Sequence, residues 1–165
     1  MLEGDFRIGP PLDALICWHE LARHGLTVTG TPYTELEIWA YQPTLIDYTR
    51  ANLDGYWRNW AERLAVVEPD KITDWVCSWC VLGVARLHHL LITGEMTSKS
   101  GAGRWAPTYY DDRWQRILAE GLRCREGGAD QYVGDRNQRA ADTASFVAMV
   151  VETGTDVPGP SQQLG

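Results

Sequence analysis

The run DWVCSWCVLGVARLHHLLIT, residues 74–93, constrains the fold of this chain more than any other feature. Its apolar residues occur on nearly every side of a helix, a pattern typical of a helix buried within a bundle. Thr73 or Asp74 is expected to cap its N-terminus, and Gly94 is expected to end it. The longest apolar stretch is interrupted by Arg86 and is too short to cross a bilayer, so we expect no membrane-spanning segment.

Helical periodicity continues on both sides of this central run. Further helices are expected at residues 14–24 with Asp13 as cap, from Tyr33 onward with a break at Pro43, and at residues 44–67, 97–107, 111–126 and 137–154. The last helix is expected to face the core with Ala141, Ala144, Phe146, Val147, Val150 and Val151. The connections are short, and residues 26–32 form at most one strand-like fragment. The pattern predicts an all-α fold, a helical bundle of five to six helices with a frayed C-terminal tail.

A chain of 165 residues is expected to form one main domain. Eight tryptophans and 44% hydrophobic residues are sufficient for a substantial core. We assign residues 1–32 to a connector and the first helix, residues 33–153 to the helical domain, and residues 154–165 to a disordered tail.

The formal net charge of -7 argues against nucleic acid as a partner, because non-specific affinity for its phosphates comes from clustered Lys and Arg. An acidic surplus is compatible with a cationic ligand or simply with solubility. The first residues lack the charged and apolar regions of a secretory signal, so we expect a cytoplasmic protein.

Cys77 and Cys80 form a C-x-x-C pair inside the apolar run. A zinc site would need His88 and His89 as well, but adjacent residues on a helix point about 100° apart and do not both reach one ion. No second Cys pair follows, and free cysteines are among the most buried residue types. The spacing therefore favours buried, reduced thiols, and we expect no metal site.

Lys99 and Arg86 are the two cations whose surroundings need an explanation. Lys99 lies in TSKSGAGRW at a helix start, where free backbone N–H groups and a mobile cation suit a phosphate, although a solvated turn gives the same pattern. Arg86 lies among apolar neighbours, so it must pair with a carboxylate, reach the surface or face a ligand cleft.

Aromatic residues gather in two segments. Trp57 and Trp60 fit a contact stripe between helices, whereas Trp105, Tyr109 and Tyr110 follow the Lys99 segment closely. The chain contains no G-x-S-x-G, H-E-x-x-H or G-x-G-x-x-G motif and no strand with paired aspartates for two-metal chemistry. We therefore expect no catalytic residue in this chain.

Two segments resemble a known family. ARLHHLLITGEMTSKSGAGRWA and RWQRILAEGLRCREG are similar to the helical C-terminal domain of aminoglycoside nucleotidyltransferases, the adenylyltransferases that modify streptomycin and spectinomycin. Arg86, the Thr93-Gly94 pair, Lys99 and the segment GRWA match the family pattern. The resemblance covers about residues 2–152.

The resemblance implies a partner lobe, an N-terminal nucleotidyltransferase domain with a Gly-Ser motif and paired metal-binding aspartates. Neither is in this chain, and the general-base glutamate of the family would fall just before Met1. The parent enzyme is expected to use ATP and Mg²⁺ and to transfer AMP to a hydroxyl of an aminoglycoside. Arg86 and Lys99 match the residues that hold the ATP phosphates.

The family pattern is not kept everywhere. Arg125 stands where the family has a tyrosine near the nucleotide, and residues 76–79 read VCSW where the family has acidic and polar residues for the drug. Asp74 is the nearest carboxylate, so the expected substrate-cleft residues are Asp74, Trp79, His89 and Arg125.

The expected function is that of a substrate- and nucleotide-clamping domain that is inactive alone. Two alternatives belong to other classes. One is a stand-alone module that sequesters a cationic ligand with the acidic surplus, and the other is an interaction protein that forms a homodimer through an exposed interdomain face.

Overall fold

The computed structural model describes residues 15–156, and all of the regular structure in this range is helical. This confirms the predicted all-α fold. The chain divides into two compact units, with the boundary between Leu45 and Ile46.

The first unit contains α1 (Leu15–His24) and the short 3-10 helix η1 (Tyr33–Glu35), which contact each other. α1 ends before Gly25 as expected, while its predicted cap, Asp13, lies outside the described residues. The prediction of a helix continuing from Tyr33 is wrong beyond this one turn.

Pro43 begins a helix and does not break one. α2 (Gln42–Asn52) has Pro43 as its second residue, where the missing N–H of proline has no intrahelical partner to lose. Proline also disfavours the helical conformation in the residue before it, which limits how far the helix extends toward the N-terminus.

α2 continues through the π-helical segment η2 (Leu53–Trp57) into α3 (Arg58–Leu64) without leaving the helical backbone conformation. The described residues contain seven α-helices, or six when the continuous α2–η2–α3 run is counted as one helix. This number agrees with the prediction of five to six helices. The π-helical segment buries Leu53 and Trp57 and contacts both α4 (Asp74–Thr93) and α7 (Arg136–Thr155).

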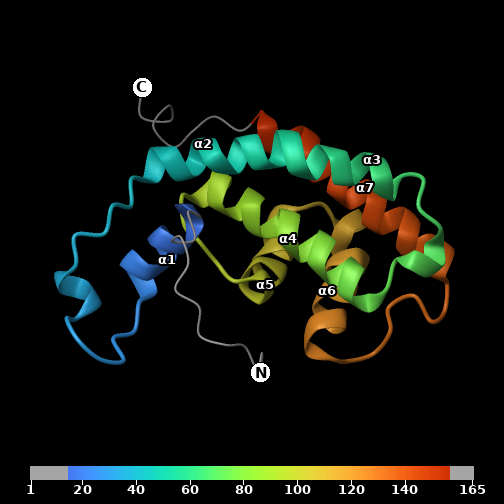
Figure 1. Ribbon diagram of the computed structural model, residues 1–165. Helices are drawn as coiled ribbons and strands as arrows, with labels where there is room; N and C mark the ends of the chain where they lie inside the picture. Colours follow the sequence, from blue (N-terminus) through green and yellow to red (C-terminus); the bar gives the residue numbers. More distant parts are fainter. Residues whose placement is uncertain (1–14, 157–165) are drawn as a thin grey trace. The chain divides into compact units, whose positions relative to one another are not determined.

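α4 is the central helix of the second unit. It packs against η2, α5 (Lys99–Tyr109), α6 (Gln115–Glu126) and α7, and Figure 1 shows it between the α2–α3 run and the α5–α6 pair. The predicted caps are confirmed, because the Thr73 hydroxyl accepts the Val76 N–H at 3.3 Å and Gly94 adopts a left-handed φ of 74°. By length and hydropathy α4 could cross a membrane, but 67% of its most apolar window is buried inside the bundle, as expected for a core helix.

Small residues allow α5 and α6 to approach α4 closely. A Cβ atom on Gly103 would lie 2.7 Å from the Leu122 side chain of α6 and 2.9 Å from the Leu82 side chain of α4. A Cβ atom on Gly121 of α6 would lie 3.2 Å from the Val81 side chain. Gly103 of the Lys99 segment therefore has a packing role, whatever else the segment does.

α7 buries Phe146, Val147, Val150 and Val151, as the periodicity predicts. Ala141 is exposed, so its assignment to the core is wrong, and Ala144 is only partly buried. Ala140 and Thr143 are buried in their place. Thr143 satisfies its hydroxyl by donating to the Arg139 carbonyl at 2.8 Å, which makes a polar residue acceptable there.

We predict that Gly103→Val destabilises the chain by about 1–3 kcal/mol, because the added side chain overlaps Leu82 and Leu122 in a packed contact. Urea denaturation measures the free energy of unfolding. Gly55→Ala is the matched control, because Gly55 is exposed, has helical φ and has no atom within 4 Å of its added Cβ. Equal stability of the Gly103→Val variant and the parent would contradict the close approach of α5.

His88 is the buried histidine of α4. Its Nδ1 and the Tyr110 hydroxyl share a hydrogen bond of 2.5 Å, while its Nε2 is buried without a partner. Burial lowers the pKa of His88 to about 4, so the folded chain keeps this ring neutral.

We predict that stability falls as the pH drops from about 6.5 toward 4. In this window the unfolded chain binds a proton at His88 and the folded chain does not, so lowering the pH favours unfolding, by on the order of 3 kcal/mol over the full window. His88→Gln removes the titration and should flatten the dependence of the free energy of unfolding on pH between 6.5 and 4.5. An unchanged slope in this variant would show that other groups cause it.

Candidate functional site

Arg86 of α4, Lys99 of α5 and Arg125 of α6 lie close together and form what we call the cationic cluster. Burial lowers the pKa of Lys99, and the positive charges of Arg86 and Arg125 lower it further. The Arg125 Nε donates to the Ser100 hydroxyl at 3.3 Å, which ties the end of α6 to the start of α5.

Within residues 15–156, neither Arg86 nor Lys99 has a carboxylate partner or a hydrogen bond from its charged group. The Arg86 Nε is buried with no hydrogen-bond partner. Arginine does not lose its proton in proteins, so this nitrogen has a permanent, unsatisfied donor. An unpaired buried donor next to other cations is costly for the free chain and favours the binding of an anion.

Six other arginines of the described residues form ion pairs with carboxylates. The ion pairs join Arg50 to Asp47, Arg58 to Asp54, Arg104 to Glu126, Arg136 to Asp70, and both Arg123 and Arg139 to Asp74 and Glu120. Arg63, Arg113, Arg116 and Arg125 also have no carboxylate partner within the described residues, but they lie over aromatic rings or donate hydrogen bonds to uncharged oxygens. Among the arginines of residues 15–156, only Arg86 has a buried nitrogen without a hydrogen-bond partner.

The start of α5 adds backbone donors to the cluster. The Ser98 hydroxyl accepts the Gly101 N–H at 2.9 Å and caps this helix. Lys99 and Ser100 are the first two residues of the helix, and N–H groups at these positions have no partner within a helix. The positive end of the helix dipole lies at the same place, so the local field also favours an anion.

Trp79 and His89 lie on the same side of α4 as Arg86, because their spacings of seven and three residues match the helical repeat. The Lys99 Nζ lies 5.8 Å from the centroid of the Trp79 ring, which places this ring beside the cationic cluster. His89 donates from Nδ1 to the Glu95 carbonyl at 2.9 Å and meets the Trp105 ring edge-on at 4.8 Å.

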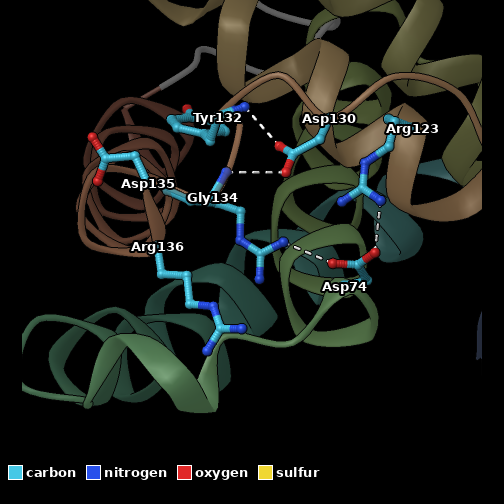
Figure 2. Close-up of a pocket in the computed structure, with 8 residues that line it drawn as sticks. Asp74, Arg123, Asp130, Tyr132, Gly134, Asp135 and Arg136 are labelled. Atoms are coloured by element: carbon cyan, nitrogen blue, oxygen red, sulfur yellow. Dashed lines mark hydrogen bonds and ion pairs between the residues drawn. The ribbon is translucent and has the colours of Figure 1, made fainter.

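Asp74 belongs to a different group of side chains. Its carboxylate accepts hydrogen bonds of 2.7 Å from Arg123 and from Arg139, and Figure 2 shows the Arg123 guanidinium directed at it. The hydrogen bond from Arg123 is the main reason that the pKa of Asp74 lies below its usual value. Buried Glu120 accepts from the same two arginines, so these four side chains form one ion-pair network.

A polar cavity of about 270 Å³ opens beside this network. Figure 2 shows residues that line it, and Asp130 there accepts the backbone N–H groups of Tyr132 and Gly134 at 2.7 and 3.3 Å. Asp74 of the cavity is paired with Arg123 and Arg139, and Arg136 is paired with Asp70, whereas Arg86 and Lys99 of the cationic cluster have no carboxylate partner within the described residues.

The described residues offer no good place for a divalent metal. Asp74, Glu120 and Cys124 bring their ligand atoms within 4.8 Å of one another, but Arg123 and Arg139 already occupy the carboxylates with positive charge. Cys77 and Cys80 of the C-x-x-C pair are buried free thiols. Burial raises the pKa of Cys80 to about 12, so its thiol stays protonated.

The sequence reasoning missed two parts of this region. Trp75 lies four residues before Trp79 on α4, so the two side chains are neighbours on one side of the helix. The helical periodicity of the sequence could have predicted this pair. The pairing of Arg139 with Asp74 and Glu120 joins residues far apart in the chain, and no local pattern indicates it.

We predict that Lys99→Met raises the melting temperature of the unliganded chain. Folding lowers the pKa of Lys99, so its charge is less favourable in the folded state than in the unfolded state, and removing the charge removes this cost. The chain has two lysines, Lys71 and Lys99, so ¹³C-labelled lysine gives two signals, and the Lys99 signal should titrate below the usual value of about 10.4. Lys71→Met, at an exposed position, is the control for melting. A Lys99 pKa at or above the usual value would contradict the cluster.

The comparison with protein families gives one match. The family described as "Aminoglycoside adenylyltransferase, C-terminal domain" matches residues 56–150. Searches of the curated proteins and of the solved structures found no match. The matched range includes Arg86, Lys99 and Arg125 and extends from the π-helical segment to α7. The chain therefore belongs to the family of aminoglycoside adenylyltransferase C-terminal domains.

Proposed function

We propose that this chain is the nucleotide-clamping domain of an adenylyltransferase and that the cationic cluster binds the phosphates of ATP. The observation that supports this most strongly is that the neighbouring cations Arg86 and Lys99 form no ion pair with any carboxylate of the described residues. Charge-assisted hydrogen bonds to phosphate would satisfy the unpaired Nε of Arg86 and offset the repulsion that, together with burial, lowers the pKa of Lys99.

The three cations come from three helices, which suits a ligand with several charged groups. Arg86 is fixed near the middle of α4, Lys99 begins α5, and Arg125 lies at the end of α6. A triphosphate presents oxygens along its length and can meet all three side chains and the free N–H groups of α5. Arg125 stands where the family has a tyrosine, so a positive charge replaces an aromatic ring at this position.

The reaction of the parent enzyme would transfer AMP from ATP to a hydroxyl of an acceptor, with pyrophosphate as the leaving group. In that reaction this chain would position the phosphates and offset their charge. Mg²⁺ would be expected with ATP, but the cationic cluster does not suit it, because the cluster consists of positive side chains.

The metal-binding carboxylates and the general base would therefore be supplied by an N-terminal nucleotidyltransferase domain, and this chain alone would not catalyse the transfer. The family name suggests an aminoglycoside acceptor and a role in antibiotic resistance. A cytoplasmic location also stays a prediction.

We predict that the chain binds ATP with Mg²⁺ and that Arg86→Ala and Lys99→Ala each weaken the binding roughly 10- to 100-fold. This range follows from the value of about 1.5–3 kcal/mol for a hydrogen bond to a charged group. Isothermal titration calorimetry on the full chain measures both the affinity and the heat.

Lys71→Ala, in the short 3-10 helix η3 (Pro69–Lys71), and Arg58→Ala, in an ion pair with Asp54, are the control variants. Neither should change the affinity. Equal binding by the parent and the Lys99→Ala variant would contradict the phosphate assignment. An absence of heat with both ATP and streptomycin would instead favour the alternative of an interaction module.

A further inference from the structure

Lys99 presents an amine that has no carboxylate partner among the described residues. Its Nζ lies 5.8 Å from the centroid of the Trp79 ring. That ring packs against the rings of Trp57 at 4.7 Å and Trp75 at 5.7 Å, so the amine faces an apolar wall on this side. Lys99 is also partly buried, and water therefore stabilises its charge less than it does the charge of an exposed lysine.

The charges around this amine favour its neutral form. Burial lowers the pKa of Lys99 most, and the positive charges of Arg86 and Arg125 lower it further. The Cys80 thiol acts in the opposite direction, but burial raises the pKa of Cys80 to about 12, so this group carries no negative charge near neutral pH. The neutral amine is the nucleophilic form of lysine, and desolvation together with neighbouring cations is a known way to activate it.

The groups around the amine are suited to hold a phosphate beside it. Arg86 has the unpaired, buried Nε, and Arg125 is tied to the start of α5 through the Ser100 hydroxyl at 3.3 Å. A phosphate bound by these two arginines would lie next to the Lys99 Nζ. In an acyl phosphate, the carbonyl carbon is joined to the phosphate through a single oxygen, so this binding would also place the carbonyl within reach of the amine.

We propose that Lys99 is a modification site, acylated by a small acyl phosphate such as acetyl phosphate that binds at the cationic cluster. The Lys99 Nζ attacks the carbonyl carbon and forms an amide, while the bond between this carbon and the bridging oxygen breaks. Phosphate leaves with the electron pair of that bond and takes up the proton that the nitrogen loses. The inference rests on the proposed function, since it takes the cationic cluster as the site that holds the phosphate.

Acylation of Lys99 would regulate the binding of ATP. The amide is neutral, so the cationic cluster loses one of its charges and the ammonium group that would donate to phosphate. The amide also avoids the cost of holding a charge against the Trp79 ring, so the fold accepts the modification. An acylated chain therefore stays folded and binds nucleotide weakly.

The test compares the two lysines of the chain, because exposed Lys71 is an internal reference for Lys99. The full chain is incubated with acetyl phosphate, and mass spectrometry of its peptides measures the acetylation rate at each lysine. Lys99 should react roughly 10-fold faster than Lys71 or more, because its neutral fraction is larger and the bound phosphate places the carbonyl beside it. N-acetoxysuccinimide, which carries the same acetyl group without a phosphate, should give a smaller ratio.

Competition shows whether the phosphate directs the reaction. An excess of pyrophosphate should slow the acetylation of Lys99 by acetyl phosphate and leave the rate at Lys71 unchanged. Arg125→Gln should slow the reaction of Lys99 in the same way, because it removes a charge that holds the phosphate. Arg58→Gln is the matched control, since Arg58 is also an exposed arginine and is paired with Asp54.

The effect on nucleotide is measured by isothermal titration calorimetry with ATP and Mg²⁺. The chain acetylated at Lys99 should bind roughly 10- to 100-fold more weakly than the untreated chain, the range expected for loss of a hydrogen bond to a charged group. Lys99→Arg keeps the charge and offers no amine to acetylate. Treatment with acetyl phosphate should therefore leave the ATP affinity of this variant unchanged.

Equal acetylation rates at Lys99 and Lys71 would overturn the inference, and so would a rate at Lys99 that pyrophosphate does not slow. Full ATP affinity in the chain acetylated at Lys99 would overturn its regulatory part. The proposed function fails separately, when the untreated chain does not bind ATP. The acetylation rates are measured without ATP, so the two failures are distinguishable.

Discussion

The structure depends on the burial of α4 on nearly all of its sides. Twelve of its 20 residues are buried, and η2, α5, α6 and α7 all pack against it. A helix in this position leaves little freedom to its neighbours, because each must match its surface with small residues such as Gly103 and Gly121. The position of Lys99 follows from this packing, since the close approach of α5 to α4 brings the start of α5 beside Arg86.

The charged residues of α4 differ in how they are paired. At its N-terminus Asp74 joins Glu120, Arg123 and Arg139 in one ion-pair network. The cost of burying Glu120 is offset by hydrogen bonds that it accepts from Arg123, Arg139 and the Gln131 backbone N–H. Three turns later, Arg86 has no such partner. The fold can supply carboxylates to its arginines, as this network shows, and the lack of one at Arg86 within the described residues fits the phosphate binding that we propose.

The sequence predicted what depends on local chemistry. The caps at Thr73 and Gly94 are confirmed because a hydroxyl or a left-handed glycine acts within one helical turn. The helix expected from Tyr33 failed because its apolar side chains Leu36, Trp39 and Tyr41 are exposed, so packing does not stabilise a helix in this short segment.

The core assignment of Ala141 failed because alanine has almost no preference for either side of a helix. The buried side of α7 is set by its contacts with α3, η2 and α4, which the periodicity of α7 alone does not contain. The ion-pair network and the absence of a partner at Arg86 are likewise products of the tertiary fold. Sequence reasoning left Arg86 between a carboxylate partner, the surface and a cleft, and only the arrangement of the helices decides against the first of these.

The net charge of the chain argues against nucleic acid as a ligand, but it does not argue against the small triphosphate that we propose. A charge of -7 disfavours a long polyanion, because nucleic acid would meet the whole acidic surface. At physiological salt, however, charges more than about 8 Å apart are largely screened. A compact triphosphate at the cationic cluster is therefore affected mainly by Arg86, Lys99 and Arg125 and only weakly by the distant carboxylates. Partial burial strengthens these near interactions further, so an acidic chain can hold a small, highly charged anion where it would repel a large one.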